Sequence, residues 1–373
     1  MTDEMDGQTI AILTSGGDAP GMNAAIRAAT LVAIGKGARV VGVERGYRGL
    51  LNGEFRELGP QDVHDILREG GTILGSARCL EFTEREARDQ ARQRLIEAKI
   101  GSIIVIGGNG SLAGARALGD SGETELAAPR VVGVPASIDN DIGLTGLSIG
   151  VDTAMNTIVE ACDKINDTAS AHDRTFIVEV MGRDCGYLAM TSAVASGADM
   201  VLFPEAGKSE ADLVTSIVDT VLTVRKRSYR SRRVIAIMAE GVGVGTDKLK
   251  AKVDAELSRR SGEDAANVET RVTVLGHVVR GGRPTAFDRL LGSRLANVAL
   301  RSVGRGDTQK MAAWMPPVEF PPEIAERSSA DPYCWLVELE AALVETERLL
   351  SGASPLARWR ASVFEDLEDV FIL

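Results

Sequence analysis

Closely spaced cysteines, long apolar runs and excess positive charge are all missing from this sequence, and each absence narrows its function. The four cysteines lie far apart, at positions 79, 162, 185 and 334, without a CxxC pair. Neither a zinc site nor a disulfide framework is therefore indicated, and we expect reduced thiols. No apolar run approaches the roughly 20 residues of a membrane-spanning helix, so no membrane association is expected.

The charge balance is acidic, with a formal net charge of −11 at pH 7. Such a charge argues against a broad surface that follows nucleic-acid phosphates, although local basic clusters can still hold small anions. The first residues are acidic where a secretory signal would be basic, which favours a cytoplasmic location. With 373 residues, 44% hydrophobic and 25% charged, the chain is long enough for two globular domains.

Glycine-rich loops stand at three places in the first half of the sequence. Two of them follow predicted buried strands, at residues 16–23 and 107–111, and the third spans residues 70–79 and contains Arg78. Glycine lets the backbone approach a phosphate closely, and the N–H groups at a following helix start supply donors. Each loop alone could equally be a tight turn, and Arg78 an ordinary surface arginine. Together the three loops indicate a nucleotide or polyphosphate pocket.

An acidic loop ends a further strand within residues 131–142. The Val-Val-Gly-Val run fits a strand covered on both faces, and open α/β sheets bind ligands beyond the carboxyl ends of such strands. Asp139 and Asp141, in the sequence Ser-Ile-Asp-Asn-Asp, therefore stand where chemistry is expected. Taken alone, the loop would more often be an acidic turn, since Asp and Asn favour turns for local reasons.

Charged side chains also stand at strand ends in the second half, where strands and helices alternate as in a parallel sheet. These residues are Arg174 and Arg183 around one strand, Glu240 after another, and Arg271, His277 and Arg280 within residues 270–282. By residue type alone, a histidine is as often a hydrogen-bonded core residue as a ligand contact. The basic run at 225–233 is more simply a solvated helix end.

Five segments together resemble the 6-phosphofructokinase family, and its bacterial ATP-dependent type most. They are LTSGGDAPGMNAAIR at 13–27, GGTILGSAR at 70–78, SIDND at 137–141, EVMGR at 179–183 and TVLGHVVRGG at 273–282. The resemblance covers about residues 9–310. Five motifs in the family's order are far more specific than any one of them.

The resemblance implies an α/β fold of two similar Rossmann-like three-layer domains with parallel-rich sheets and an active site in the cleft between them. Residues 1–150 with about 269–312 would form the nucleotide-binding domain, 151–268 the sugar-phosphate domain, and 313–373 a C-terminal helical extension. A homotetramer, or a homodimer, is expected, with Arg174 and Arg271 reaching a neighbouring subunit's site.

The resemblance also implies catalytic roles. Asp139 matches the base that takes the proton from the sugar 1-hydroxyl, and Asp141 matches a second acidic residue near the metal. A carboxylate within hydrogen-bond reach makes that hydroxyl a better nucleophile as the phosphoryl group departs. Ser137 takes the position of a threonine or serine in the same loop. Arg183 and Arg78 fall where positive charge stabilises the transferring group.

Further family positions bind the two substrates. Those that match the nucleotide site are Gly17, Arg78, Cys79, Gly108, Asn109, Gly110 and Ser111. Those that match the sugar-phosphate site are Ser137, Asp139, Arg174, Met181, Gly182, Arg183, Glu240, Arg271, His277 and Arg280. In the second set, three residues match contacts to the fructose moiety (Met181, Gly182 and Glu240), and two match contacts to its 6-phosphate (His277 and Arg280).

Two departures from the family pattern stand out. Asn109 occupies the position of an aspartate that helps hold the nucleotide's magnesium with Asp141, and a neutral amide is a poorer partner for a hard dication. Leu31 and Asn166 stand where allosteric bacterial members carry effector-binding arginines, although Arg27 is retained. Weak or absent regulation by nucleoside diphosphate or phosphoenolpyruvate is therefore expected.

The phosphoryl donor is predicted from two small residues. Family members that use pyrophosphate carry an aspartate at the position of Gly110 and a lysine at that of Ala136, so ATP with Mg²⁺ is favoured here. The expected reaction converts fructose 6-phosphate to fructose 1,6-bisphosphate in glycolysis. The alternatives are a pyrophosphate-dependent or related phosphosugar kinase and, from another class, a non-catalytic sugar-phosphate sensor or regulatory subunit.

Overall fold

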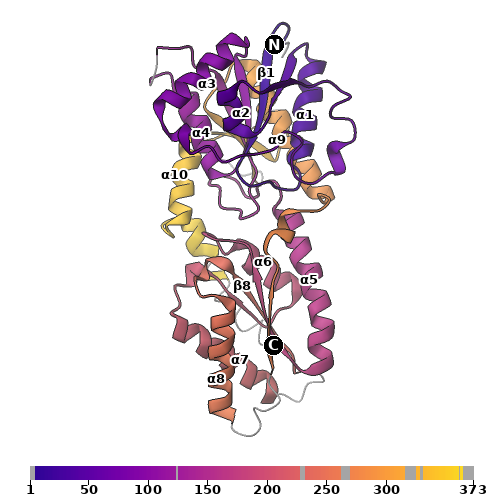
Figure 1. Ribbon diagram of the computed structural model, residues 1–373, viewed down its shortest axis with the longest axis vertical. Coiled ribbons are helices and arrows are strands. Elements are labelled where there is room, and N and C mark those ends of the chain that lie inside the picture. The colour runs from indigo at the N-terminus through magenta and orange to yellow at the C-terminus, as the bar shows by residue number, and fades with distance from the viewer. Residues whose placement is uncertain are drawn as a thin grey trace. The chain divides into compact units, whose positions relative to one another are not determined.

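The computed structural model describes residues 5–122, 125–226, 232–261, 269–315, 325–327, 331–360, 362 and 363. The chain divides into two compact units. The first unit comprises the residues up to Thr153 together with Arg280–Arg348, and the second comprises Ala154–Val279 and the residues from Leu349 onward. Figure 1 labels the main elements. None of the described helices has the length and apolar character needed to cross a membrane.

An eight-stranded sheet forms the centre of the first unit, in the order β11-β12-β10-β5-β4-β1-β2-β3. Its strands are β1 (Thr9–Ser15), β2 (Arg39–Val43), β3 (Phe55–Glu57), β4 (Ser102–Gly107), β5 (Arg130–Pro135), β10 (Lys310–Trp314), β11 (Ala325–Arg327) and β12 (Cys334–Glu338). The run from β10 to β2 is parallel, and antiparallel pairing is confined to the outer strands β3, β12 and β11. The parallel-rich α/β sheet expected from the sequence is confirmed.

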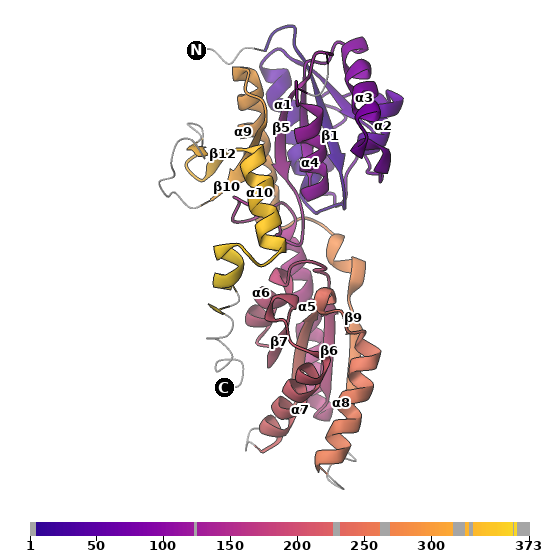
Figure 2. The same cartoon turned by 90° about the vertical axis from the view of Figure 1, so that its left-hand side faces the viewer.

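Helices cover both faces of this sheet, as Figure 1 and Figure 2 show. On one face, α1 (Met22–Gly35) and α9 (Ala286–Arg305) pack against each other. Four helices share a buried core with the other face: α2 (Gly46–Asn52), α3 (Arg85–Glu97), α4 (Asn109–Leu118) and α10 (Leu339–Leu350). Two short 3-10 helices, η1 (Ile66–Arg68) and η2 (Leu80–Thr83), lie along the connection from β3 to α3.

The central strands of this sheet end together at one edge, where a ligand could bind. All residues of β4 are buried, as expected for a Val- and Ile-rich strand with helices on both sides. In the sheet register Ser15 pairs with Gly107 and Gly107 pairs with Pro135. The strands β1, β4 and β5 therefore end side by side, and the loops that follow them begin at one edge of the sheet.

The second unit is built on a four-stranded parallel sheet in the order β7-β8-β6-β9. Its elements are α5 (Val151–His172), β6 (Thr175–Val180), α6 (Tyr187–Ser196), β7 (Met200–Leu202), η3 (Pro204–Ala206), α7 (Glu210–Lys226), β8 (Val234–Ala239), η4 (Glu240–Val242), α8 (Thr246–Ser261), β9 (Thr270–Val274) and η6 (Gly276–Arg280). The helices α7 and α8 share a core with the sheet, and α6 contacts β7 and β8. The loops after β6 and β8 start side by side because these strands are neighbours.

The structure differs from the expected domain boundaries at two places. Strand β9 pairs with β6, so the chain returns to the first unit only at Arg280, later than the expected boundary near 269. The expected helical extension at 313–373 is wrong, because buried residues of β10 and β12 complete the large sheet and only α10 follows as a helix. Most of the basic run 225–233 and of the proline-rich stretch 315–322 lies outside the described residues.

Candidate functional site

The glycine loops after β1 and β4 touch each other in the first unit. Gly16 has a φ of 85°, and a Cβ atom there would lie 3.1 Å from the Ser111 Oγ. At Gly107 a Cβ would lie 2.4 Å from the carbonyl oxygen of Ser15, which no real side chain could tolerate. Glycine is therefore required where the two strand ends meet.

The loop at residues 70–79 joins the same cluster through hydrogen bonds. The Ser76 hydroxyl donates to the Gly16 carbonyl at 2.6 Å. The Thr14 hydroxyl donates to the Gly75 carbonyl at 2.9 Å and lies 2.9 Å from the Thr72 hydroxyl. The three loops that the sequence indicates as a phosphate pocket are thus brought together at the end of β1.

The acidic loop after β5 is held by its central residue, Asn140, whose role the sequence reasoning missed. Asn140 is buried with a left-handed φ of 51°, a conformation that asparagine tolerates better than most residues. Its amide donates to the Gly146 carbonyl at 3.1 Å and accepts from the Ser148 N–H at 3.1 Å. The Ser148 hydroxyl donates to the Ser137 carbonyl at 2.5 Å, which closes the loop.

Asp141 links this loop to the start of α4. Its two carboxylate oxygens accept hydrogen bonds, one from the Ser137 hydroxyl at 2.8 Å and one from the Asn109 amide at 2.6 Å. Asn109 is the first residue of α4, so this bond joins the loops after β4 and β5. Asp139, two residues before Asp141, is half-buried in the same loop.

The residues present fit a magnesium ion that arrives with phosphate ligands. The Asn109 Oδ1 is buried and accepts no hydrogen bond from the described residues, because the amide nitrogen is the atom turned toward Asp141. An amide oxygen beside a carboxylate is an acceptable ligand pair for Mg²⁺ when phosphate and water complete the shell. No group of three or more His, Cys, Asp or Glu residues among those described could hold a metal by itself.

The start of α4 offers a further anion-binding feature. The residues Gly108, Asn109, Gly110 and Ser111 form its N-terminus, where backbone N–H groups and the helix dipole favour negative charge. A Cβ at Gly110 would meet no atom within 4 Å, so the space beside it is open. The Tyr47 hydroxyl donates to the Ser111 carbonyl at 2.6 Å, and burial raises the pKa of Tyr47, which keeps it a neutral donor. The sequence reasoning had no signal for Tyr47.

Arg78 and Cys79 are less fixed by their surroundings. Arg78 is exposed and makes no hydrogen bond or ion pair with the described residues. The Cys79 thiol donates to the Glu81 carboxylate at 3.6 Å, and burial raises its pKa above the ordinary value. Cys79 is therefore a neutral thiol at physiological pH and is unsuited to act as a nucleophile.

Arg280 lies beside the first glycine loop. Its Nη1 donates to the Asp18 carbonyl at 3.4 Å, and a Cβ at Gly17 would lie 2.4 Å from the same nitrogen. The sequence resemblance pairs Arg280 with His277 as contacts to the sugar 6-phosphate. Arg280 begins the returning segment of the first unit, whereas His277 is an exposed residue of the second.

In the second unit, the loops after β6 and β8 are in contact. The Gly241 N–H donates to the Gly182 carbonyl at 3.1 Å, and a Cβ at Gly241 would lie 2.1 Å from the Arg183 carbonyl oxygen. The candidates Met181, Gly182 and Arg183 thus stand beside Glu240, the residue before Gly241. The Arg183 side chain is 77% exposed, and its Nε donates to Asp184 at 3.1 Å.

Glu179 adds a carboxylate to this edge of the sheet. Burial raises the pKa of Glu179, and the neighbouring Glu240 carboxylate raises it further, against a hydrogen bond with Thr246 that lowers it. Glu179 belongs to a motif that the sequence singles out, but sequence reasoning gave it no role.

Arg174 and Arg271 lie at the other end of the same sheet. Both form ion pairs with Glu269, which the sequence reasoning missed, and the Arg174 Nε is 2.8 Å from its carboxylate. Arg174 precedes β6, whereas Arg183 follows it, and a strand of six residues spans about 20 Å. The two arginines are therefore far from the loop that carries Arg183 in the same chain.

Comparison with known proteins places these loops in a family. The family model for phosphofructokinase matches residues 9–303. The chain belongs to the phosphofructokinase family. It is 44% identical over 304 residues to a Clostridium acetobutylicum protein named ATP-dependent 6-phosphofructokinase, covering 82% of this chain and 88% of that protein. A Clostridioides difficile protein of the same name is 48% identical over 288 residues, covering 77% and 83% of the two chains.

A solved structure agrees with the phosphofructokinase fold. The crystal structure of Pichia pastoris phosphofructokinase in the T-state superposes with a TM-score of 0.79 at 34% identity. The match covers 94% of this chain but only 39% of the Pichia chain, so the chain spans well under half of that longer protein.

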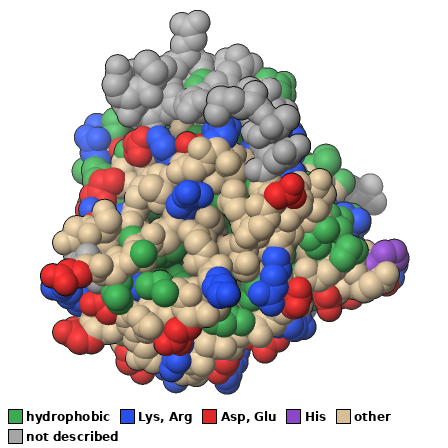
Figure 3. All heavy atoms as spheres, turned by 90° about the horizontal axis from the view of Figure 1, so that it is seen from above, with side chains coloured by type: hydrophobic (Ala, Val, Ile, Leu, Met, Phe, Trp, Pro, Cys, Tyr) green, Lys and Arg blue, Asp and Glu red, His purple; other side chains and the backbone are tan. Residues whose placement is uncertain are grey.

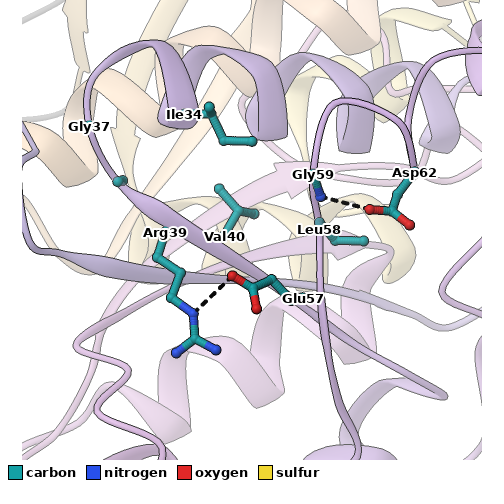
Figure 4. Close-up of a pocket in the computed structure, with 9 residues that line it drawn as sticks. Ile34, Gly37, Arg39, Val40, Glu57, Leu58, Gly59 and Asp62 are labelled. Atoms are coloured by element: carbon teal, nitrogen blue, oxygen red, sulfur yellow. Dashed lines mark hydrogen bonds and ion pairs between the residues drawn. The ribbon is translucent and has the colours of Figure 1, made fainter.

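One surface hollow is unrelated to the phosphofructokinase motifs. Figure 4 shows its lining, which includes Ile34, Arg39, Glu57 and Asp62. Arg39 is the first residue of β2, so the hollow lies at the amino end of that strand, away from the glycine loops. On the face drawn in Figure 3, Lys and Arg side chains are interspersed with Asp and Glu side chains among the described residues.

Proposed function

We propose that this phosphofructokinase family member transfers the γ-phosphoryl group of ATP to the 1-hydroxyl of fructose 6-phosphate, giving fructose 1,6-bisphosphate. The observation that carries the proposal is the junction of the loops after β1, β4 and β5, where Ser137 and Asn109 fix Asp141 beside Asp139. The two bacterial relatives named ATP-dependent 6-phosphofructokinase support the same donor and reaction.

The first unit is the donor side of this proposal. The glycine loops around Gly16 and Gly75 and the N-terminus of α4 present backbone N–H groups that suit the ATP phosphates. The open space beside Gly110 leaves room for the nucleotide beyond them. Arg78 is exposed and able to turn toward the transferring group, whose charge it would stabilise.

Asp139 is the general base for the sugar hydroxyl. The hydrogen bonds of Asn140 and of the Ser137 carbonyl fix the backbone on both sides of Asp139 before substrate arrives. Asp139 accepts the proton of the 1-hydroxyl as the hydroxyl oxygen attacks the γ-phosphorus. The bond between the γ-phosphorus and the bridging oxygen breaks, and ADP leaves with that oxygen and the electron pair of the bond.

Asn109 and Asp141 would hold the magnesium ion through the amide oxygen and a carboxylate oxygen. Bound there, the ion would neutralise charge on the donor phosphates. Asn109 also donates a hydrogen bond to Asp141. An aspartate at position 109 would instead repel the Asp141 carboxylate when no metal is bound.

The second unit supplies the acceptor side. Met181, Gly182 and Glu240 would contact the fructose moiety from adjoining loops, and Arg183 would stabilise the transferring phosphoryl group. His277 and Arg280, the latter from the first unit, would bind the 6-phosphate through the N–H donors of their side chains.

Arg174 and Arg271 would serve the site of another subunit. Their position at the amino end of β6 and β9, about 20 Å from the Arg183 loop, supports this role. The proposal therefore requires an oligomer, a homotetramer or at least a homodimer, in which each site receives these arginines from a neighbour.

A donor panel tests the proposed function. The purified chain is given fructose 6-phosphate with ATP, GTP or pyrophosphate, and fructose 1,6-bisphosphate is measured directly, with the Asp139→Asn variant as the blank. We expect turnover with ATP and little with pyrophosphate. Turnover with pyrophosphate alone would replace the donor, and no turnover with any donor would favour a sugar-phosphate sensor.

A further inference from the structure

The C-terminal segment packs on the second unit, outside the part of the chain that the family model matches. Residues 355–360 are helical, and the buried Ser354 begins this turn by accepting from the Leu356 N–H through its hydroxyl at 3.0 Å. The Arg358 N–H donates to the Ser354 carbonyl at 3.2 Å. Ala357 and Arg360 are both 8% exposed, so the segment is docked through one side.

Arg360 makes the specific contacts of this segment. Its guanidinium carbon lies 4.6 Å from the ring centroid of Tyr187, within the range of a cation–π interaction. Its Nη1 lies 4.0 Å from the Cys185 Sγ. Tyr187 is the first residue of α6, and Cys185 stands two residues after Arg183. The segment therefore touches the loop that carries the candidate catalytic arginine.

That loop is fixed at both ends and exposed in the middle. At its start, Gly182 has a φ of 130°, and a Cβ there would lie 2.6 Å from the Cys185 carbonyl oxygen, so the chain folds back tightly. At its end, the Gly186 N–H donates to the Glu205 carboxylate at 2.9 and 3.1 Å. Cys185 is only 7% exposed, whereas Arg183 is exposed.

We propose that Arg360 is a positioning residue for Arg183. Through its contacts with Cys185 and the ring of Tyr187, Arg360 supports the end of the loop that follows Arg183 and so fixes the position from which the Arg183 side chain extends. The inference rests on the proposed function, because it assigns Arg183 to the phosphoryl-transfer site. A segment beyond the matched family region thus sets the geometry of a family motif.

Kinetics with substitutions at Arg360 test the proposal first. Arg360→Ala removes the contacts with Cys185 and Tyr187 and should lower kcat by about tenfold, since small displacements of a charge-stabilising group have large effects on rate. The KM for ATP should stay unchanged. Arg360→Lys keeps the positive charge near Tyr187 and should recover part of the rate. Trp359→Ala is the matched control, because the neighbouring Trp359 side chain is 61% exposed.

Thiol labelling separates positioning from a loss of folding. Iodoacetamide labelling followed by peptide mass spectrometry reports Cys185 and Cys162 in the same sample, and both are buried in the second unit. In Arg360→Ala we expect faster labelling of Cys185 and continued protection of Cys162. In Trp359→Ala both should stay protected.

Three results would overturn the proposal. They are unchanged labelling of Cys185 in Arg360→Ala, faster labelling of Cys185 with unchanged kcat, and equal exposure of Cys185 and Cys162, which would mean a merely structural role. Failure of the proposed function is distinguishable, because it would appear as absent turnover in the unsubstituted chain and leave the labelling result intact.

Discussion

The strand-end loops of the two units are organised in different ways. In the first unit, the candidate residues bond to one another across loops, with Asp141 held by both Ser137 and Asn109. In the second unit, Arg183 and His277 are exposed, and two further arginines lie at the opposite end of the sheet. The first set is fixed by hydrogen bonds within its unit, whereas the second includes Arg183 and His277, whose side chains are exposed.

This difference matches the chemistry that each unit is proposed to perform. A base must be in place when the hydroxyl attacks, and prearranged polar groups lose little energy in reorganisation during reaction. An exposed guanidinium such as that of Arg183 keeps its hydration until a phosphorylated ligand replaces the water, so it suits a substrate that enters and leaves.

Asp139→Asn should have the largest effect, because it removes the base while nearly keeping the size of the side chain. We expect kcat to fall by at least about a hundredfold, with the KM for ATP little changed. Asp62→Asn, in the surface hollow at the amino end of β2, is the control and should leave kcat unchanged. A near-normal kcat for Asp139→Asn would show that Asp139 is not the general base.

Asn140→Ala should release the prearranged loop. The variant loses the amide's hydrogen bonds with the Gly146 carbonyl and with the Ser148 N–H and hydroxyl, and it places alanine at a left-handed φ. Together these changes should lower the free energy of unfolding by about 2–3 kcal/mol. Urea unfolding measures the change. Asn140→Gly also loses the amide's hydrogen bonds, but glycine adopts a left-handed φ without strain. Its free energy of unfolding should therefore fall less than that of Asn140→Ala. Equal stability of all three chains would show that Asn140 does not hold the loop.

Arg271→Ala should damage a neighbouring site rather than its own. The loss of a phosphate contact should raise the KM for fructose 6-phosphate by about tenfold. Coexpression with Asp139→Asn chains should give mixed oligomers with turnover above the sum of the separate variants, because some sites then hold both intact residues. Arg39→Ala, at the exposed first residue of β2, is the control. Simple averaging of the two activities would place Arg271 in its own chain's site, or in none.

Asn109→Asp should have the smallest effect and sharpen the metal assignment. Two neighbouring carboxylates repel each other until a cation binds, so the thermal midpoint of the variant should fall in EDTA and rise on adding Mg²⁺. Mg²⁺ affinity should increase several-fold, to about tenfold, measured by calorimetry. An identical Mg²⁺ response in both chains would exclude position 109 from the metal site.

The sequence predicts the cluster of glycine loops well because its signals are local. Strand, glycine loop and helix start are contiguous, and neighbouring parallel strands must bring such loops to one edge, as Gly16, Gly107 and Ser76 show. The family resemblance then assigns roles that no local pattern contains. The structural role of Asn140 could also have been predicted, since an asparagine between two aspartates suits a left-handed turn position.

Other features depend on contacts that no local pattern encodes. The Asn109 amide could be identified as a departure but not as the partner of Asp141, since 32 residues separate them. The pairing of β9 with β6, and the return of β10 and β12 to the large sheet, are long-range choices between strands of similar composition. The contact of Arg360 with Cys185 spans 175 residues and has no sequence signature at all.

Following the phosphoryl group itself tests the proposed reaction most directly. Fructose 6-phosphate labelled with carbon-13 at C1 is incubated with ATP and the purified chain, and carbon–phosphorus coupling at C1 is recorded by NMR. We predict new coupling at C1 in the unsubstituted chain and almost none with Asp139→Asn. Phosphorylation at another position would contradict the proposed reaction, and equal coupling with Asp139→Asn would contradict the assignment of Asp139 as its base.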